Sequence, residues 1–173
     1  MFNQPYFVIM YDVHMLFSST HQSNINAISR PDFLIIKYHD PSSTDSFSRL
    51  RKINLKSSQM PTDIAQTLQN PSLKKMCWDA EATQAITHSL LSEAGICYNH
   101  FLDDYVDVKE LLHSYGYTCR SLTQIAKQFK LPVCPKANVR NPTLLTKRFQ
   151  VLNAVIQRLV TIDGQNLFDG ILI

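Results

Sequence analysis

Acidic side chains stand at the ends of two apolar segments of this 173-residue chain. Asp12 comes at the end of the first apolar segment, and Asp79 and Glu81 directly follow the run 73–78. Carboxylate oxygens are the ligands that hard cations such as Mg²⁺ prefer. Two divalent ions about 4 Å apart hydrolyse phosphodiesters, one by activating water and the other by stabilising the leaving oxygen. These residues therefore indicate metal-dependent phosphodiester chemistry, provided that several carboxylates meet at one place.

The same residues also have structural interpretations, and both remain open at the level of the sequence. Asp79 has the position of a helix N-cap, and Glu81 would lie favourably in the first turn of that helix. Asp12 can bond to nearby backbone amides at its strand end. Asp107 stands three residues before Glu110, which is the spacing of a capping box and predicts a helix start.

The elements that would position these side chains form an α/β pattern. Strand patterns cover 6–10, 33–39, 51–56 and 73–78, and helix patterns cover 62–69, 80–94, 107–116, 121–129 and a long segment from Asn141-Pro142. The segment 51–56 alternates, with Ile53 and Leu55 on one side, and is expected at a sheet edge. Residues 18–31 are expected as a loop, and the tail 161–173 is a candidate for a short edge strand. This order predicts a mixed sheet covered by helices in a single domain, residues 1–173.

Composition is that of an ordinary globular protein: 45% of residues are hydrophobic, 18% are charged, and the net charge is +3. The four cysteines form no CxxC pair and have apolar neighbours, so we expect reduced, buried thiols and a cytoplasmic location. No apolar stretch is long enough to span a membrane, and the first residues lack the pattern of a signal peptide. The four glycines form no phosphate-binding loop, and no local signature supports cysteine–histidine catalysis.

From about residue 5 to residue 160, the chain resembles the proofreading 3′–5′ exonuclease domain of phage family A DNA polymerases, a DEDD exonuclease of the RNase H-like superfamily. The family's Asp-x-Glu motif corresponds to Asp12-Val13-His14, and its Asn-Ala-x-Phe-Asp/Glu motif to Asp79-Ala80-Glu81-Ala82-Thr83. The Asp-Val and Ser-Leu pairs that open later helices are also present, at 107–108 and 121–122. The family's Tyr-x-x-x-Asp motif corresponds to Phe149 and Asn153.

The resemblance implies an RNase H-like mixed sheet flanked by helices, and a metal site at positions 12, 14, 83 and 153. Of these four positions this chain keeps a carboxylate only at Asp12, because the others are His14, Thr83 and Asn153. Phe149 lacks the phenolic hydroxyl that the family uses to orient the attacking water. The resemblance also places the segment before the last helix beside single-stranded substrate, where basic side chains could contact phosphates. These are Lys136, Arg140, Lys147 and Arg148.

Three hypotheses for function follow from these residues. The first is a degenerate, weakly active or inactive exonuclease-like domain that binds nucleic acid or protein. The second is an active 3′–5′ exonuclease that uses Mg²⁺ or Mn²⁺ with Asp12 and either Asp79 or Glu81. The third is a protein-interaction or inhibitor protein on the same scaffold. Single-stranded DNA or a protein is the expected partner, and a membrane is not.

Overall fold

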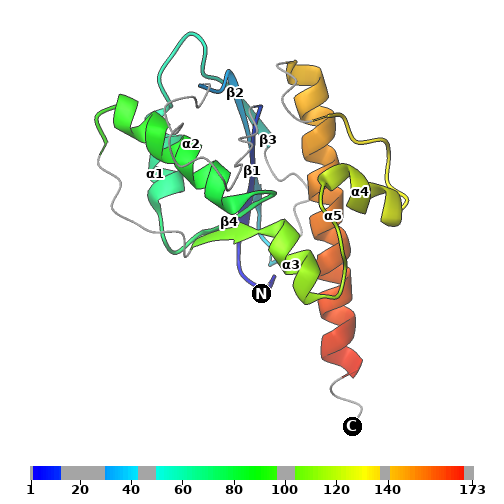
Figure 1. Cartoon of the computed structure of the whole chain (residues 1–173). Coiled ribbons are helices and arrows are strands. Elements are labelled where there is room, and N and C mark those ends of the chain that lie inside the picture. Colours follow the sequence, from blue (N-terminus) through cyan, green and yellow to red (C-terminus); the bar gives the residue numbers. More distant parts are fainter. Residues whose placement is uncertain (1, 13–29, 43–49, 97–103, 137–140, 170–173) are drawn as a thin grey trace, which may run out of the picture.

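A five-stranded mixed sheet forms the centre of the computed structural model, which describes residues 2–12, 30–42, 50–96, 104–136 and 141–169 (Figure 1). Its strands are β1 (Tyr6–Tyr11), β2 (Phe33–His39), β3 (Leu50–Asn54), β4 (Lys74–Cys77) and β5 (Tyr105–Asp107), in the order β3-β2-β1-β4-β5. The pairs β1–β2 and β2–β3 are antiparallel, whereas β4 and β5 run parallel to β1. The predicted mixed sheet is confirmed.

All four predicted strands are present, and the structure adds a fifth strand, β5, beside β4 at the end of the sheet. β2 has the predicted bounds, and β3 is an edge strand with Ile53 buried and Leu55 buried directly after it. Sequence analysis missed β5 as a strand. Its three residues are too few to show a strand period, and their pairing with β4 cannot be read from neighbouring positions.

Five helices complete the described residues: α1 (Thr62–Gln69), α2 (Ala80–Glu93), α3 (Val108–Ser114), α4 (Leu122–Gln128) and α5 (Pro142–Asp169). Each of the last four begins at a predicted cap, because the side chains of Asp79, Asp107, Ser121 and Asn141 accept hydrogen bonds from first-turn amides. The edge strand considered for the tail is wrong for residues 161–169, where α5 continues through Gly164. Residues 170–173 lie outside the described part of the chain.

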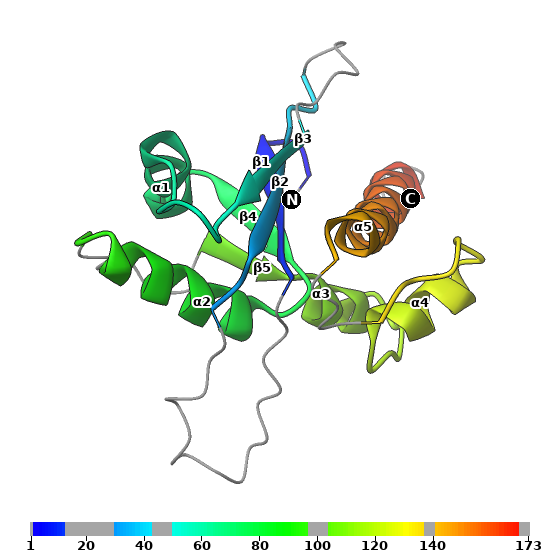
Figure 2. The same cartoon turned by 90° about the horizontal axis from the view of Figure 1, so that it is seen from above.

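The sheet separates two hydrophobic cores, and the alternation of β1 assigns each side chain to one of them. Val8 and Met10 point to the side of α3, α4 and α5, which we call the α5 face. Ile9 and Tyr11 point to the side of α1 and α2, which we call the α2 face. Figure 2 shows the two groups of helices on opposite sides of the strands. Among the described helices, none is long and apolar enough to cross a membrane.

Candidate functional site at the carboxyl ends of the parallel strands

Three aspartates lie at or just beyond the carboxyl ends of the three parallel strands. Asp12 follows β1, Asp79 follows β4 by two residues, and Asp107 is the last residue of β5. Because β1, β4 and β5 are neighbours in the sheet, these ends share one edge. Ligands of α/β proteins typically bind outside the carboxyl ends of such strands. This edge is therefore where a functional site is expected.

Asp12 connects the end of β1 to the start of β2. Its side chain is 3% exposed, and Oδ1 accepts hydrogen bonds from the backbone N–H groups of Asp32, at 2.9 Å, and Phe33, at 3.2 Å. The interpretation of Asp12 as a strand-end residue that bonds backbone amides is thus confirmed. Asp12 is the only one of the four family positions that keeps a carboxylate. One oxygen of that carboxylate is used to fix the backbone at the start of β2.

Asp79 is the N-cap of α2 and Glu81 lies in its first turn, as predicted. Oδ1 of Asp79 accepts from the backbone N–H of Ala82 at 3.0 Å. The Glu81 side chain is exposed to solvent, where a negative charge near the helix N-terminus is favourable. Both residues serve the start of the helix.

Asp107 caps two helices at once. Its Oδ1 accepts from the N–H groups of Lys109, at 2.9 Å, and Glu110, at 3.3 Å, while Oδ2 accepts from the N–H of Ala80 at 3.1 Å. Burial raises the pKa of the Asp107 carboxyl, and these backbone donors oppose that rise. The N-cap role was predicted, but the bond to Ala80 was not, because no local pattern shows that α2 and α3 begin side by side.

Thr83 lies in α2 against the α2 face of the sheet. Its hydroxyl is hydrogen-bonded with the Cys77 thiol, whose pKa is raised by burial. The backbone carbonyl of Thr83 accepts from the hydroxyl of Thr87 at 2.9 Å, and that hydroxyl also lies 2.8 Å from the phenol of Tyr11. Thr83 therefore belongs to a buried polar contact between α2 and the sheet.

Asn153 lies at the other end of β1 from Asp12. Its Oδ1 accepts from Nε2 of His39 at 2.9 Å, and His39 pairs with Tyr6, the first residue of β1. The six residue steps from Tyr6 to Asp12 span roughly 20 Å along a strand. Phe149, one helical turn before Asn153, is 1% exposed in the core on the α5 face. The structure thus does not bring Asn153 to Asp12, as the family pattern would require.

The basic side chains proposed for phosphate contact divide into two kinds. Lys136 and Lys147 are exposed. Arg148 instead turns toward the segment before α5, where Nη1 donates to the carbonyl of Pro135 at 2.9 Å and lies 3.4 Å from Sγ of Cys134. Burial lowers the pKa of this guanidinium. Arg140 and His14 lie outside the described residues.

A two-ion site does not fit the side chains at this edge. Among the described residues, no three His, Cys, Asp or Glu side chains come close enough to hold a metal ion. Asp12, Asp79 and Asp107 each accept hydrogen bonds from backbone amides through at least one oxygen. At positions 83 and 153, a neutral hydroxyl and a neutral amide stand where the family pattern has carboxylates, the ligands that usually hold Mg²⁺.

Comparisons with known proteins support the fold. No model of a known protein family matches the sequence, and a search of curated proteins finds no match. Among solved structures, the chain is similar to the crystal structure of the EXO domain of Nibbler from Aedes aegypti, with a TM-score of 0.55 and 10% sequence identity. The match covers 91% of this chain and 80% of that one. The chain thus has the predicted RNase H-like fold, a mixed five-stranded sheet with flanking helices.

Proposed function

We propose that this chain is a degenerate 3′–5′ exonuclease-like domain that does not cleave nucleic acid and instead binds it in single-stranded form. The observation that carries the proposal is the hydrogen bond between Asn153 and His39, which holds the last motif position near the start of β1, while Asp12 lies beyond its end. A carboxylate at position 153 would thus not complete a metal site with Asp12.

The alternative of an active exonuclease needs Asp79 or Glu81 to join Asp12 at a metal ion. In the structure Asp79 caps α2 and Glu81 faces solvent, so no observation favours that arrangement.

We also propose a kinship with the proofreading domains of phage polymerases, based on the motif order, and a reducing compartment such as the cytoplasm. The thiols of Cys77, Cys119 and Cys134 are free and buried, which supports that location.

The proposal is tested with labelled single-stranded DNA and RNA in the presence of Mg²⁺ or Mn²⁺. We expect no cleavage by the native chain above the background of Asp12→Ala. Asp12→Asn keeps an oxygen that can accept from the amides of Asp32 and Phe33, so it controls for loss of folding in Asp12→Ala. Cleavage that both variants abolish while circular dichroism stays native would establish the active enzyme instead.

Binding is measured separately by fluorescence anisotropy with the same oligonucleotides in EDTA. We expect an affinity that falls steeply with salt, because contacts between lysines and phosphates release counterions. Absence of both cleavage and salt-sensitive binding would favour a protein-interaction role on the same scaffold.

A further inference from the structure

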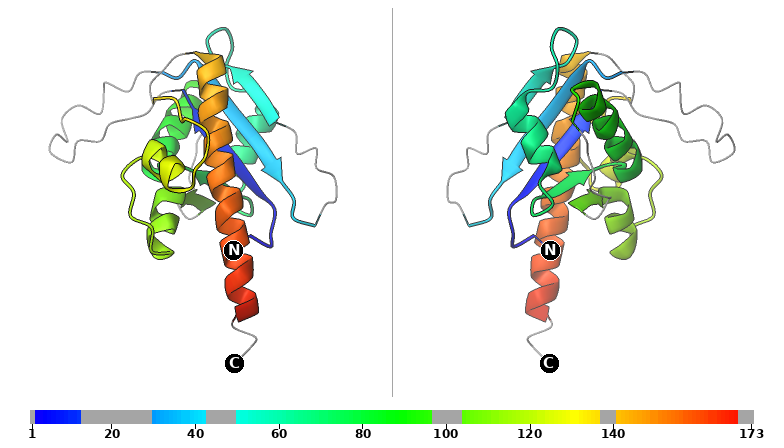
Figure 3. Two further views of the ribbon diagram at one scale, coloured as in Figure 1. Left: turned by 90° about the vertical axis from the view of Figure 1, so that its right-hand side faces the viewer. Right: turned by 90° about the vertical axis from the view of Figure 1, so that its left-hand side faces the viewer.

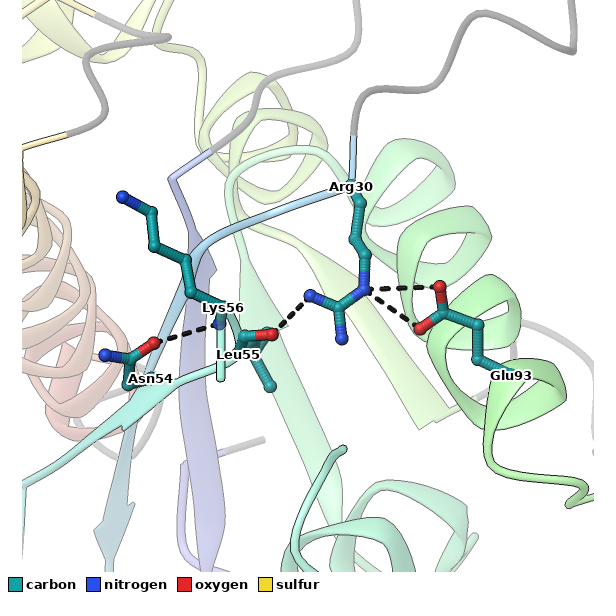
Figure 4. Close-up of polar contacts among 5 residues, drawn as sticks. All are labelled: Arg30, Asn54, Leu55, Lys56 and Glu93. Carbon is teal, nitrogen blue, oxygen red and sulfur yellow. Dashed lines mark hydrogen bonds and ion pairs between the residues drawn. The ribbon is translucent and has the colours of Figure 1, made fainter. Parts of the chain in front are cut away.

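The α5 face of β2 and β3 carries a set of lysines that follows from the strand register. Cross-strand partners share a face, so Lys37, opposite Val8, and Lys52, opposite Ile35, both point to the side of α5. Asn54, opposite Phe33, lies in the same row as Lys52. Figure 4 shows Asn54 and Lys56 on the side of β3 that faces α5, whereas Arg30 and Glu93 lie toward α2.

This part of the sheet is open to solvent. α5 crosses β1 and β2, and the left view of Figure 3 shows β2 and β3 extending beyond it without a helix in front of them. Lys52, Asn54 and Lys56 are exposed, and Leu50, the cross-strand partner of Lys37, is 37% exposed. The opposite side of β3 is different, because there Ile53 is buried in the core with α1.

The charge of this surface is predominantly positive. β2 and β3 contain no acidic residue, and the segment 142–162 of α5 contains none either. Asp32 lies just before β2, where it pairs with Lys56 at 3.6 Å, and Asp40 lies just after β2. Among the described residues, Lys37 and Lys52 form no ion pair. The positive charge of Lys37 also contributes to the lowered pKa of His39, although burial is the larger cause.

The three lysines are spaced along the sheet rather than gathered at one point. Lys37 and Lys52 are diagonal neighbours, with Cβ atoms about 7 Å apart. Lys56 lies four positions after Lys52, a separation of at most about 13 Å along the chain. The backbone N–H of Lys56 donates to Oδ1 of Asn54 at 2.9 Å, and this bond fixes the turn that presents Lys56. Such spacing suits an extended polyanion better than a single compact anion.

We propose that Lys37, Lys52 and Lys56, the β2–β3 lysine face, bind the phosphodiester backbone of single-stranded nucleic acid. This inference rests on the proposed function and gives it a surface other than the carboxyl edge of the parallel strands. Amide side chains border the face on α5, where Asn153 and Gln157 bond to His39 and Tyr6. Within the described part of the chain, no exposed aromatic ring lies on the lysine face, so the proposed recognition is through phosphates and independent of sequence.

The test compares two triple variants that remove equal charge. Lys37→Gln/Lys52→Gln/Lys56→Gln neutralises the lysine face, and Lys127→Gln/Lys136→Gln/Lys147→Gln neutralises three exposed lysines around α4 and the start of α5. Binding of a fluorescent oligothymidylate is measured over a range of salt concentrations. The logarithm of the association constant falls linearly with the logarithm of the salt concentration. Each lost phosphate contact makes that line less steep by about 0.7. We expect the line for the first variant to be less steep by about 2. Its affinity at ~0.1 M salt should fall by up to about a hundredfold.

The outcomes separate this inference from the proposed function. Equal weakening by both variants, or weakening by the second alone, overturns the lysine face but leaves nucleic-acid binding in place. Absence of binding by the native chain overturns both. Because Lys37 is half-buried, Lys52→Glu/Lys56→Glu is measured as a second variant that alters exposed side chains alone. Stronger binding of polyglutamate or of phosphatidylserine vesicles than of the oligonucleotide would also contradict the inference.

Discussion

Asn153 shows at the scale of one residue why a motif position does not define a site. We predict that Asn153→Asp, which restores the carboxylate of the family pattern, yields no cleavage with Mg²⁺ or Mn²⁺. The new carboxylate would instead accept from the His39 ring and raise the pKa of that imidazole. NMR titration of His39 and the nuclease assay measure the two effects. Metal-dependent cleavage by Asn153→Asp would contradict our placement of the site.

His39 also makes the stability of the native chain depend on pH. Burial is the main cause that lowers its pKa below the ordinary value of 6.5, so the unfolded chain binds the proton more readily. The free energy of unfolding should therefore fall as the pH drops from 6.5 through the lowered folded pKa. In His39→Gln this part of the pH dependence should be missing. Urea denaturation at several pH values checks it, and parallel curves for both proteins would show that His39 has no such role.

At the scale of elements, Asp107 joins the starts of α2 and α3. Asp107→Ala removes an acceptor from three backbone amides and should lower the free energy of unfolding by about 2 kcal/mol. Asp107→Asn keeps one acceptor oxygen for α3, but its NH₂ group cannot accept from Ala80. It should lower that free energy by about 1 kcal/mol. Thermal or urea denaturation measures both, and Asp79→Ala, which removes one cap, is the matched control.

Local signals account for the elements that sequence analysis predicted. Helix starts at Asp79, Asp107, Ser121 and Asn141 depend on a side chain and an amide two or three residues away, and such pairs are visible in a sequence. The relations that failed or were missed join distant segments. Whether position 153 of α5 lies near Asp12 depends on packing between segments that are more than a hundred residues apart. The spacing within the motif does not determine this packing.

At the scale of the whole molecule, the sheet couples the two cores. Leu152 is fully buried on the α5 face and Leu68 on the α2 face. We expect Leu152→Ala and Leu68→Ala each to lower the free energy of unfolding by about 2–5 kcal/mol. Both should shift one common transition, because the cores share the strands between them. Far-ultraviolet circular dichroism and Trp78 fluorescence report that transition, and two separated transitions would show that the cores unfold independently.

The position of β3 at the edge of the sheet has a consequence for self-association. An edge strand exposes backbone groups that can pair with the same strand of another copy. Arg51 of this strand pairs with Asp63, whereas Lys52 has no ion pair among the described residues, so the Lys52 charges of two such edges would repel each other on approach. High salt screens that repulsion, and a bound polyanion neutralises it. The charge of Lys52, which would attract a polyanion, thus also opposes the pairing of two copies of the chain strand to strand.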